Sequence, residues 1–286
     1  VKDKKSNLLI YDAINKILNK NKIKAPKLIL QNYNKNYIEI EYLGKYSIYK
    51  KIINNKKNKL KYYKKIIKLL KKLQKIKDTK ISTFLNSKYS IPTYSNELLF
   101  KEASLFTKWY LPKIFSTKKK DILRKKFQKL FKKYLNNLKY KNNTFVHRDF
   151  HASNLIYFKN DVGVIDSQDA IYGNPAYDLA SLIDDVRIKT NLKEKEEIYK
   201  EFIKNNKYIN PISFRNDFET LSVLRNFKII GIFTRLSQRD KKHQYLNLIP
   251  HAWKLIETRI NKNKNFSEMK NLISSNFLNQ NKFKKK

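Results

Sequence analysis

The stretch from Phe145 to Asp169 constrains the fold of this chain more than any other part of the sequence. Two short groups of polar residues flank two apolar runs, NLIYF and VGVID. A predicted turn at residues 159–161 separates the runs, so together they predict a β-hairpin whose second strand ends on Asp166. A hairpin brings the end of its second strand back to the start of its first. We therefore expect Asp166 to lie beside the loop that carries Asp149 and Asn154.

The polar residues of this stretch have the spacing of a phosphoryl-transfer site. Asp149 and Asn154 are five residues apart, as in the catalytic loop H-R-D-x-x-x-x-N of kinases. Such transfer needs a carboxylate that orients the acceptor hydroxyl, and an amide and a second carboxylate that hold Mg²⁺. The pattern therefore predicts Asp149 as the catalytic residue and Asn154 and Asp166 as metal ligands. The alternative is a chance tripeptide with aspartates in ordinary turns, but the order of loop, hairpin and second aspartate argues against it.

The residues that follow the hairpin extend this pattern. The run YGNPAYDLASLIDD places Gly173, Pro175 and Asp178 in a turn that enters a helix. Together with the loop and hairpin, it resembles the aminoglycoside phosphotransferase and choline kinase family, whose pattern is H-x-D-x-x-x-x-N, then I-D, then G-x-P-x-x-D-L-A. The resemblance implies an α+β, protein-kinase-like, two-lobed fold with a truncated N-terminal small lobe and a mainly helical C-terminal lobe. It also implies ATP and Mg²⁺ as cofactors.

The same resemblance suggests roles for the other polar residues of the loop. His147 and Arg148 are expected to support the loop from behind. His151 is either a substrate contact or a structural histidine. Asp169 either faces the acceptor or caps the next turn. Asp178 is expected to be structural and to anchor the loop at a helix start.

The residues before the loop match the second half of a kinase small lobe. Apolar residues at helical spacing predict a helix over residues 6–20. Two strands are predicted at residues 27–31 and 36–44, and Gly44 ends the second. By the resemblance, three residues form the hinge whose backbone binds adenine: Glu41, Tyr42 and Leu43. The alternative for this segment is an ordinary hairpin edge.

Glycine is scarce, which limits how a nucleotide can be held. The four glycines are Gly44, Gly163, Gly173 and Gly231, so no Gly-rich loop can cover the phosphates. We therefore expect the first strands of the small lobe, with their phosphate-binding lysine, to be absent. We divide the chain into a small-lobe remnant with the hinge at residues 1–44, a large catalytic and substrate lobe at 45–262, and a basic C-terminal tail at 263–286.

Two other segments, residues 56–77 and 119–138, predict helices with one apolar face. Residues 193–204 predict a further, charged helix. A late helical segment carries three of the eight arginines on one side. Such a set can contact an anionic group of a substrate or brace the fold through ion pairs. Arg225 and Arg235 are therefore candidate substrate residues.

Composition narrows the remaining function classes. The chain has no cysteine, which excludes a disulfide and a cysteine nucleophile. No apolar run approaches the roughly 18 to 20 residues of a membrane span, so we expect no membrane contact and a cytoplasmic location. The net charge is +40, a balance that can favour nucleic acid. The lysines occur on nearly every predicted helix, however, so we expect no specific nucleic-acid partner.

The sequence leaves the oligomeric state open.

Two passages narrow the resemblance within the family. HRDFHASNLI with VIDSQDAIYGNPAYDLASLIDD, and LRNFKIIGIFTRLSQRD with YLNLIPHAWKLIE, look like bacterial kinases that phosphorylate the anomeric hydroxyl of N-acetylmuramate and N-acetylglucosamine in cell-wall recycling. In those kinases an aromatic residue follows the second aspartate, where this chain has Ser167. The resemblance implies an ATP-dependent phosphotransferase with a small-molecule substrate, an N-acetylated amino sugar. The alternatives are a kinase of another small alcohol, such as an aminoglycoside, choline or homoserine, and a catalytically dead binding protein without the phosphate loop.

Overall fold

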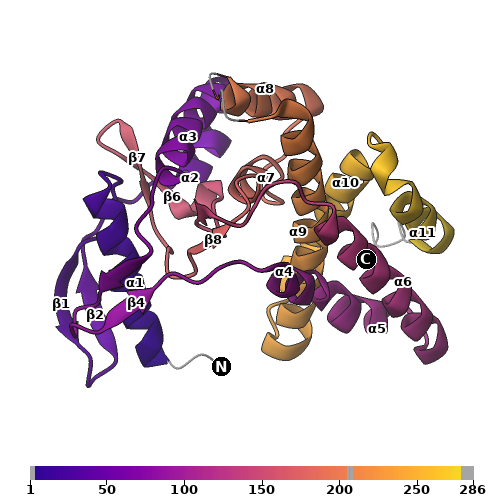
Figure 1. The fold of residues 1–286 in the computed structure, drawn as a ribbon, viewed down its shortest axis with the longest axis horizontal. Helices are drawn as coiled ribbons and strands as arrows, with labels where there is room; N and C mark the ends of the chain where they lie inside the picture. The colour runs from indigo at the N-terminus through magenta and orange to yellow at the C-terminus, as the bar shows by residue number, and fades with distance from the viewer. Residues whose placement is uncertain (1–3, 205, 207–208, 278–286) are drawn as a thin grey trace. The chain divides into compact units, whose positions relative to one another are not determined.

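The computed structural model describes residues 4–204, 206 and 209–277 of the chain. These residues form an α+β fold in which most lie in helices (Figure 1), as the sequence predicted. Contacts divide the chain into two compact units. The first holds the residues up to Tyr94 together with Tyr140–Phe214, and the second holds Ser95–Lys139 and the residues from Arg215 onward. The lobes predicted from the sequence, with boundaries after residues 44 and 262, divide the chain differently from these two units, and they stay a prediction.

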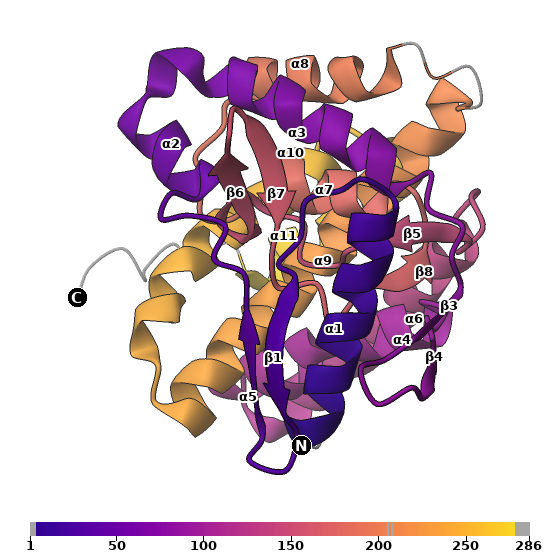
Figure 2. The same cartoon turned by 90° about the vertical axis from the view of Figure 1, so that its left-hand side faces the viewer.

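The first unit begins with a helix and a two-stranded sheet. Helix α1 (Lys4–Lys20) buries the apolar face that its sequence predicts, including Ala13 and Ile17. It runs alongside the antiparallel pair β1 (Leu28–Asn32) and β2 (Tyr37–Ile40) (Figure 2). Strand β2 ends at Ile40, so the predicted strand over residues 36–44 is shorter than expected.

The predicted hairpin after the polar loop is confirmed, although its second strand ends at Val164, two residues before the predicted end at Asp166. Strand β6 (Leu155–Phe158) pairs antiparallel with β7 (Asp161–Val164), in a register that places Phe158 opposite Asp161. The two turn residues, Lys159 and Asn160, have φ values of +42° and +63°. Two consecutive positive φ values give a two-residue turn whose twist matches that of the flanking strands. The turn thereby fixes which residue of β7 faces which residue of β6.

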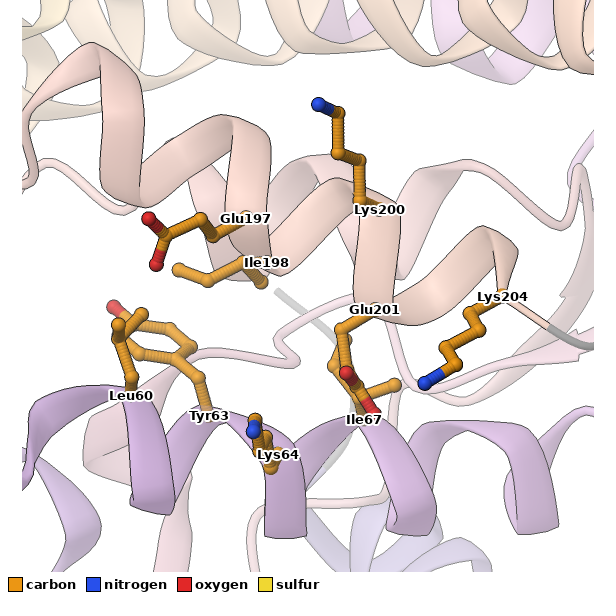
Figure 3. A pocket seen from close by; sticks show the side chains of 9 residues that line it. All are labelled: Leu60, Tyr63, Lys64, Ile67, Glu197, Ile198, Lys200, Glu201 and Lys204. Atoms are coloured by element: carbon orange, nitrogen blue, oxygen red, sulfur yellow. The ribbon is translucent and has the colours of Figure 1, made fainter.

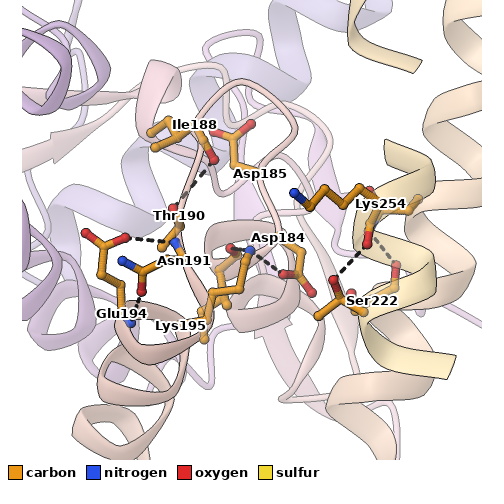
Figure 4. A network of polar contacts seen from close by, with 12 residues as sticks. Asp184, Asp185, Ile188, Thr190, Asn191, Glu194, Lys195, Ser222 and Lys254 are labelled. Atoms are coloured by element: carbon orange, nitrogen blue, oxygen red, sulfur yellow. Dashed lines mark hydrogen bonds and ion pairs between the residues drawn. The ribbon is translucent and has the colours of Figure 1, made fainter. Parts of the chain in front are cut away.

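Two helices pack against this hairpin: α2 (Ile48–Asn54) contacts β6, and α3 (Lys59–Leu73) contacts β7. A short 3₁₀ turn at Lys56–Asn58 joins them. Helix α8 (Leu192–Ile203) packs on α3 and on α7 (Tyr177–Ile183). Helix α8 starts at a capping box in which Asn191 and Glu194 satisfy each other's backbone N–H groups. Figure 4 shows this cap and the neighbouring ion pair, in which the Lys195 ammonium lies 2.6 Å from Asp184.

Two further strand pairs complete the first unit. Strand β3 (Lys80–Ser82) pairs with β4 (Lys88–Ser90), and β5 (Thr144–Val146) pairs with β8 (Ile171–Gly173); both pairs are antiparallel. The residues of β5 and β8 are almost all buried. The polar loop therefore starts from a strand that the core holds in place.

The second unit is helical and is centred on aromatic side chains. Its elements are α4 (Asn96–Ala103), a π-helical turn at Phe106–Tyr110, α5 (Leu111–Ile114), α6 (Thr117–Asn136), α9 (Pro211–Asp240) from Arg215 onward, 3₁₀ turns at His243–Leu248 and Lys264–Phe266, and α10 (Ile249–Ile260). The Phe106 ring contacts the rings of Phe127, Phe227 and Trp253. Helix α9 passes so close to this turn that a Cβ on Gly231 would lie 2.3 Å from the carbonyl carbon of Leu105.

One prediction about the C-terminal part needs correction. Within the basic tail predicted over residues 263–286, residues Ser267–Phe277 form helix α11. Met269, Ile273 and Phe277 recur every four residues on this helix and are buried, because Phe277 joins the aromatic cluster of the second unit through Trp253. Residues 278–286 of the predicted tail lie outside the described residues.

Two surface features bear on function. Within the part of the chain that the structure describes, no helix is both long and apolar enough to cross a membrane. A hollow of about 440 Å³ opens between α3 and α8, with an apolar floor that includes Ile67 and Ile198 and a rim of charged side chains (Figure 3). None of the predicted site residues lines it.

Candidate active site

The loop between β5 and β6 is anchored by a buried carboxylate. Asp178, in the first turn of α7, accepts the backbone N–H of His147 at 2.7 Å and that of Arg148 at 3.0 Å, one through each oxygen. Arg148 has a φ of +71°, a conformation that costs free energy for a residue with a Cβ and that its surroundings must hold. The prediction that Asp178 anchors the loop is therefore confirmed.

His147 connects the loop to the end of the hairpin. Its side chain is fully buried, and its Nε2 lies 3.1 Å from the carbonyl oxygen of Ile165. A carbonyl can only accept, so Nε2 carries the proton. Burial lowers the pKa of His147 from its ordinary value, so the ring is neutral at physiological pH. This geometry suits the supporting role suggested by the sequence, although that role stays a prediction.

The three residues predicted to do the chemistry lie together. The side-chain amide of Asn154 donates to the backbone carbonyl of Asp149 at 3.1 Å and to Oδ2 of Asp166 at 3.4 Å. The backbone N–H of Ile165 also donates to the carbonyl of Asn154 at 3.0 Å. The hairpin thus returns Asp166 to the loop, as its pattern predicted.

Asn154 and Asp166 present oxygen atoms of the kind that Mg²⁺ prefers. Asp166 is exposed, and its Oδ1 accepts a hydrogen bond from Gln168 at 2.9 Å. The described residues contain no cluster of three or more His, Cys, Asp or Glu side chains that could hold a metal. Mg²⁺ in kinases is instead bound by one or two protein side chains together with nucleotide phosphates and water. The pair fits that donor set, and its metal role stays a prediction.

Arg148 extends toward Asp169. Its guanidinium lies 5.0 Å from the centre of the Tyr94 ring and 3.5 Å from a carboxylate oxygen of Asp169. This contact gives Asp169 a structural partner beside the loop, and its role toward a substrate stays a prediction. His151 is buried, and its backbone N–H and carbonyl join Asp149 and Asn154 in a tight turn.

The predicted hinge differs from residue to residue. Leu43 is buried, whereas Tyr42 is 75 % exposed. Glu41 forms an ion pair with Lys24, and that hydrogen bond lowers the pKa of the Glu41 carboxyl. A Cβ on Gly163 would lie 3.2 Å from Leu43, so this glycine lets β7 pass close to the hinge. Adenine binding by these residues stays a prediction.

The two candidate arginines belong to the second unit. Arg225 is buried and Arg235 is partly exposed, both on α9. Their role as substrate residues stays a prediction.

Sequence patterns missed several polar residues around Asp166. Ser167 donates its hydroxyl to Oδ1 of Asn15 on α1 at 2.7 Å, and both side chains are buried. Tyr11, one turn earlier on α1, has a side-chain hydrogen bond with Asn15 and lies close enough to Asp166 for their charges to interact. Burial raises the pKa of Tyr11, and the charge of Asp166 acts in the same direction. An asparagine on the apolar face of α1 was the one available signal.

Comparison with known proteins identifies the family of this chain. The model of the phosphotransferase enzyme family matches residues 3–200, a span that includes the hinge, the loop and the hairpin. The chain belongs to the phosphotransferase enzyme family. Asp149, Asn154 and Asp166 therefore lie within the part of the chain that carries the family's pattern.

One curated relative of this chain is a kinase of amino sugars by name. The chain is 27% identical over 192 residues to the N-acetylmuramate/N-acetylglucosamine kinase of Pseudomonas aeruginosa. The matched segment covers 65% of this chain and 56% of that protein. The chain thus spans little more than half the length of that curated relative.

Two solved kinase structures share the fold. An ethanolamine kinase of Plasmodium vivax matches with a TM-score of 0.60 at 16% identity, over 86% of this chain and 73% of that chain. An ADP-bound aminoglycoside phosphotransferase matches with a TM-score of 0.55 at 18% identity, over 85% of this chain and 78% of that chain. At these identities the likeness concerns the fold alone, and it agrees with the kinase-like fold class expected from the sequence.

Proposed function

We propose that this chain carries the catalytic part of an ATP-dependent phosphotransferase that acts on a hydroxyl of a small molecule. The observation that carries the proposal is the position of the Asn154 amide, which bridges the backbone of Asp149 and the carboxylate of Asp166. A carboxylate that orients a hydroxyl then lies next to two oxygen ligands for a cation, which is the arrangement that phosphoryl transfer requires.

Each residue of the loop has a distinct part in this proposal. Asp149 accepts or orients the proton of the acceptor hydroxyl, and Asn154 and Asp166 hold Mg²⁺. When bound, that ion neutralises charge on the transferring phosphoryl group. His147 and Arg148 keep the loop in place. The backbone of residues 41–43 holds the adenine.

The acceptor that we favour is the anomeric hydroxyl of an N-acetylated amino sugar, as in cell-wall sugar recycling. Two observations support this choice: the two sequence passages described above, and the 27% identity to a kinase named for N-acetylmuramate and N-acetylglucosamine. ATP as the donor is supported by the ADP bound to a structural neighbour. A cytoplasmic location and the absence of a specific nucleic-acid partner complete the proposal.

The experiment is a panel of acceptors offered with Mg-ATP, with ADP release and sugar phosphate both measured. The panel holds N-acetylmuramate, N-acetylglucosamine, an aminoglycoside, choline and homoserine. Both this chain and a form extended upstream in its gene are tested. We expect transfer to the two amino sugars in the extended form. Transfer only to another alcohol would replace the acceptor, and no transfer to any member would favour a binding protein without catalysis.

A further inference from the structure

A buried hydrogen bond links α1 to the residue that follows the predicted metal ligand. Ser167 is fully buried and Asn15 is 3% exposed. The Ser167 hydroxyl donates to Oδ1 of Asn15 at 2.7 Å across 152 positions of sequence. Burying an amide costs free energy unless its polar atoms are hydrogen-bonded, so the contact with Ser167 offsets part of the cost of burying Asn15.

The backbone beside this hydrogen bond is strained. Asp166 has a φ of +61°, a left-handed conformation that costs free energy for a residue with a Cβ, although aspartate tolerates it better than most residues. On one side, His147 and Asn154 bind the backbone of Ile165. On the other side, the Ser167 hydroxyl donates to Oδ1 of Asn15. The direction of the Asp166 carboxylate therefore depends on contacts from the loop and from α1.

Helix α1 is itself fixed relative to the hairpin. The amide of Asn19 binds the carbonyl of Ala25 at 3.0 Å, and the backbone N–H of Val164 binds the carbonyl of Lys24 at 2.8 Å. Hydrogen bonds thus hold the segment after α1 between α1 and strand β7, two residues before Asp166. Tyr11, hydrogen-bonded to Asn15, adds a second side chain of α1 near the carboxylate.

We propose that Asn15 is a positioning residue for Asp166 and acts through the hydroxyl of Ser167. The inference rests on the proposed function, since it concerns the metal ligand of that site. The hydrogen bond holds the left-handed backbone at Asp166 so that its carboxylate stays beside Asn154. Without it, Asp166 keeps its charge but loses its fixed direction, and the affinity for the metal falls.

The test measures binding of Mn²⁺, used as a spin probe for Mg²⁺, by electron paramagnetic resonance in the presence of a non-hydrolysable ATP analogue. The variants are Ser167→Ala, Asn15→Leu, the double variant and Ser167→Thr. We expect each of the first two to weaken Mn²⁺ binding by about tenfold, the effect of losing one buried hydrogen bond. The double variant is no weaker than either single one, because both remove the same contact. Ser167→Thr keeps the hydroxyl and retains most of the affinity.

Tyr110→Phe is the matched control. It removes a hydroxyl that accepts a hydrogen bond from Trp253 at 3.2 Å in the second unit. It is expected to lower thermal stability and to leave Mn²⁺ binding unchanged. If Ser167→Ala and Asn15→Leu also lower only thermal stability while the parent binds Mn²⁺, the pair is merely structural and the inference is overturned.

A second measurement separates this inference from the proposed function. If the parent binds no Mn²⁺ with the nucleotide, the proposed function fails. Crystal structures of the parent and of Ser167→Ala then decide the inference on geometry alone. We expect the Asp166 carboxylate to leave its position 3.4 Å from the Asn154 amide in the variant. An unchanged position would overturn the inference.

Discussion

Asp178 holds the backbone N–H of Arg148 at 3.0 Å, although 30 positions separate the two residues in the sequence. The other oxygen of the same carboxylate holds the N–H of His147 at 2.7 Å. Arg148 adopts a left-handed backbone directly before Asp149. The orientation of the backbone at Asp149 therefore depends on the Asp178 side chain of α7.

Replacing Asp178 tests this anchor. Asp178→Ala removes the acceptor of two backbone N–H groups, one buried and one part-buried, and we expect the free energy of unfolding to fall by about 2–4 kcal/mol. Asp178→Asn keeps one acceptor oxygen and is expected to fall between the parent and the alanine variant. Urea denaturation gives the values. An unfolding midpoint for Asp178→Ala equal to that of the parent would show that the anchor contributes nothing.

The buried His147 predicts a dependence of stability on pH. Its folded-state pKa is lowered by burial, whereas the unfolded chain has an ordinary histidine pKa of about 6.5. Below that pH the unfolded state binds the proton more readily, so stability falls as the pH drops below about 6.5. His147→Gln removes this contribution. The difference in unfolding free energy between parent and variant should therefore change between pH 7.5 and 5.5, and a constant difference would argue against a neutral buried ring.

The buried ion pair of the first unit predicts an asymmetric mutational response. The Lys195 ammonium lies 2.6 Å from Asp184 and 2.7 Å from the carbonyl of Ile183. Lys195→Met leaves a buried carboxylate without its cation and is expected to cost about 3–5 kcal/mol of stability. Lys101→Met breaks an exposed pair with Glu97 and should change stability little. Equal effects in thermal denaturation would mean that burial does not strengthen the first pair.

The hairpin turn offers a stabilising substitution. Lys159 has a positive φ, where a residue with a Cβ is disfavoured and glycine is not. Lys159→Gly is expected to raise the free energy of unfolding by about 0.5–1 kcal/mol. Lys141→Gly, an exposed position without a positive φ, is the control and should not stabilise. A loss of stability in Lys159→Gly would show that the lysine side chain contributes more than the backbone strain costs.

Local patterns predicted the parts of this fold that local patterns control. The hairpin that ends near Asp166 followed from two apolar runs and a turn, and the anchor at Asp178 followed from its place at a helix start. Helix α11 was missed because its short periodic segment was grouped with the lysine-rich residues that follow it. Packing against the aromatic cluster decides that segment.

The details of the candidate site were less accessible to sequence reasoning. The contact of Asn15 with Ser167 joins residues 152 positions apart, and no spacing rule reports such a pair. The positive φ values of Arg148 and Asp166 are equally hidden, since neither residue type marks a left-handed backbone as glycine does. The sequence therefore identified which residues meet at the site, while tertiary contacts set their orientation.

The rate of γ-phosphate transfer in Asp149→Ala tests the central claim most directly. The assay follows transfer from Mg-ATP to N-acetylglucosamine and N-acetylmuramate in the form extended upstream. Asp161→Ala is the control, because this exposed carboxylate lies at the start of β7 and outside the proposed site. We expect Asp149→Ala to lower kcat by about 10²–10⁴-fold and Asp161→Ala to leave it unchanged. Equal rates for the parent and Asp149→Ala would contradict the account.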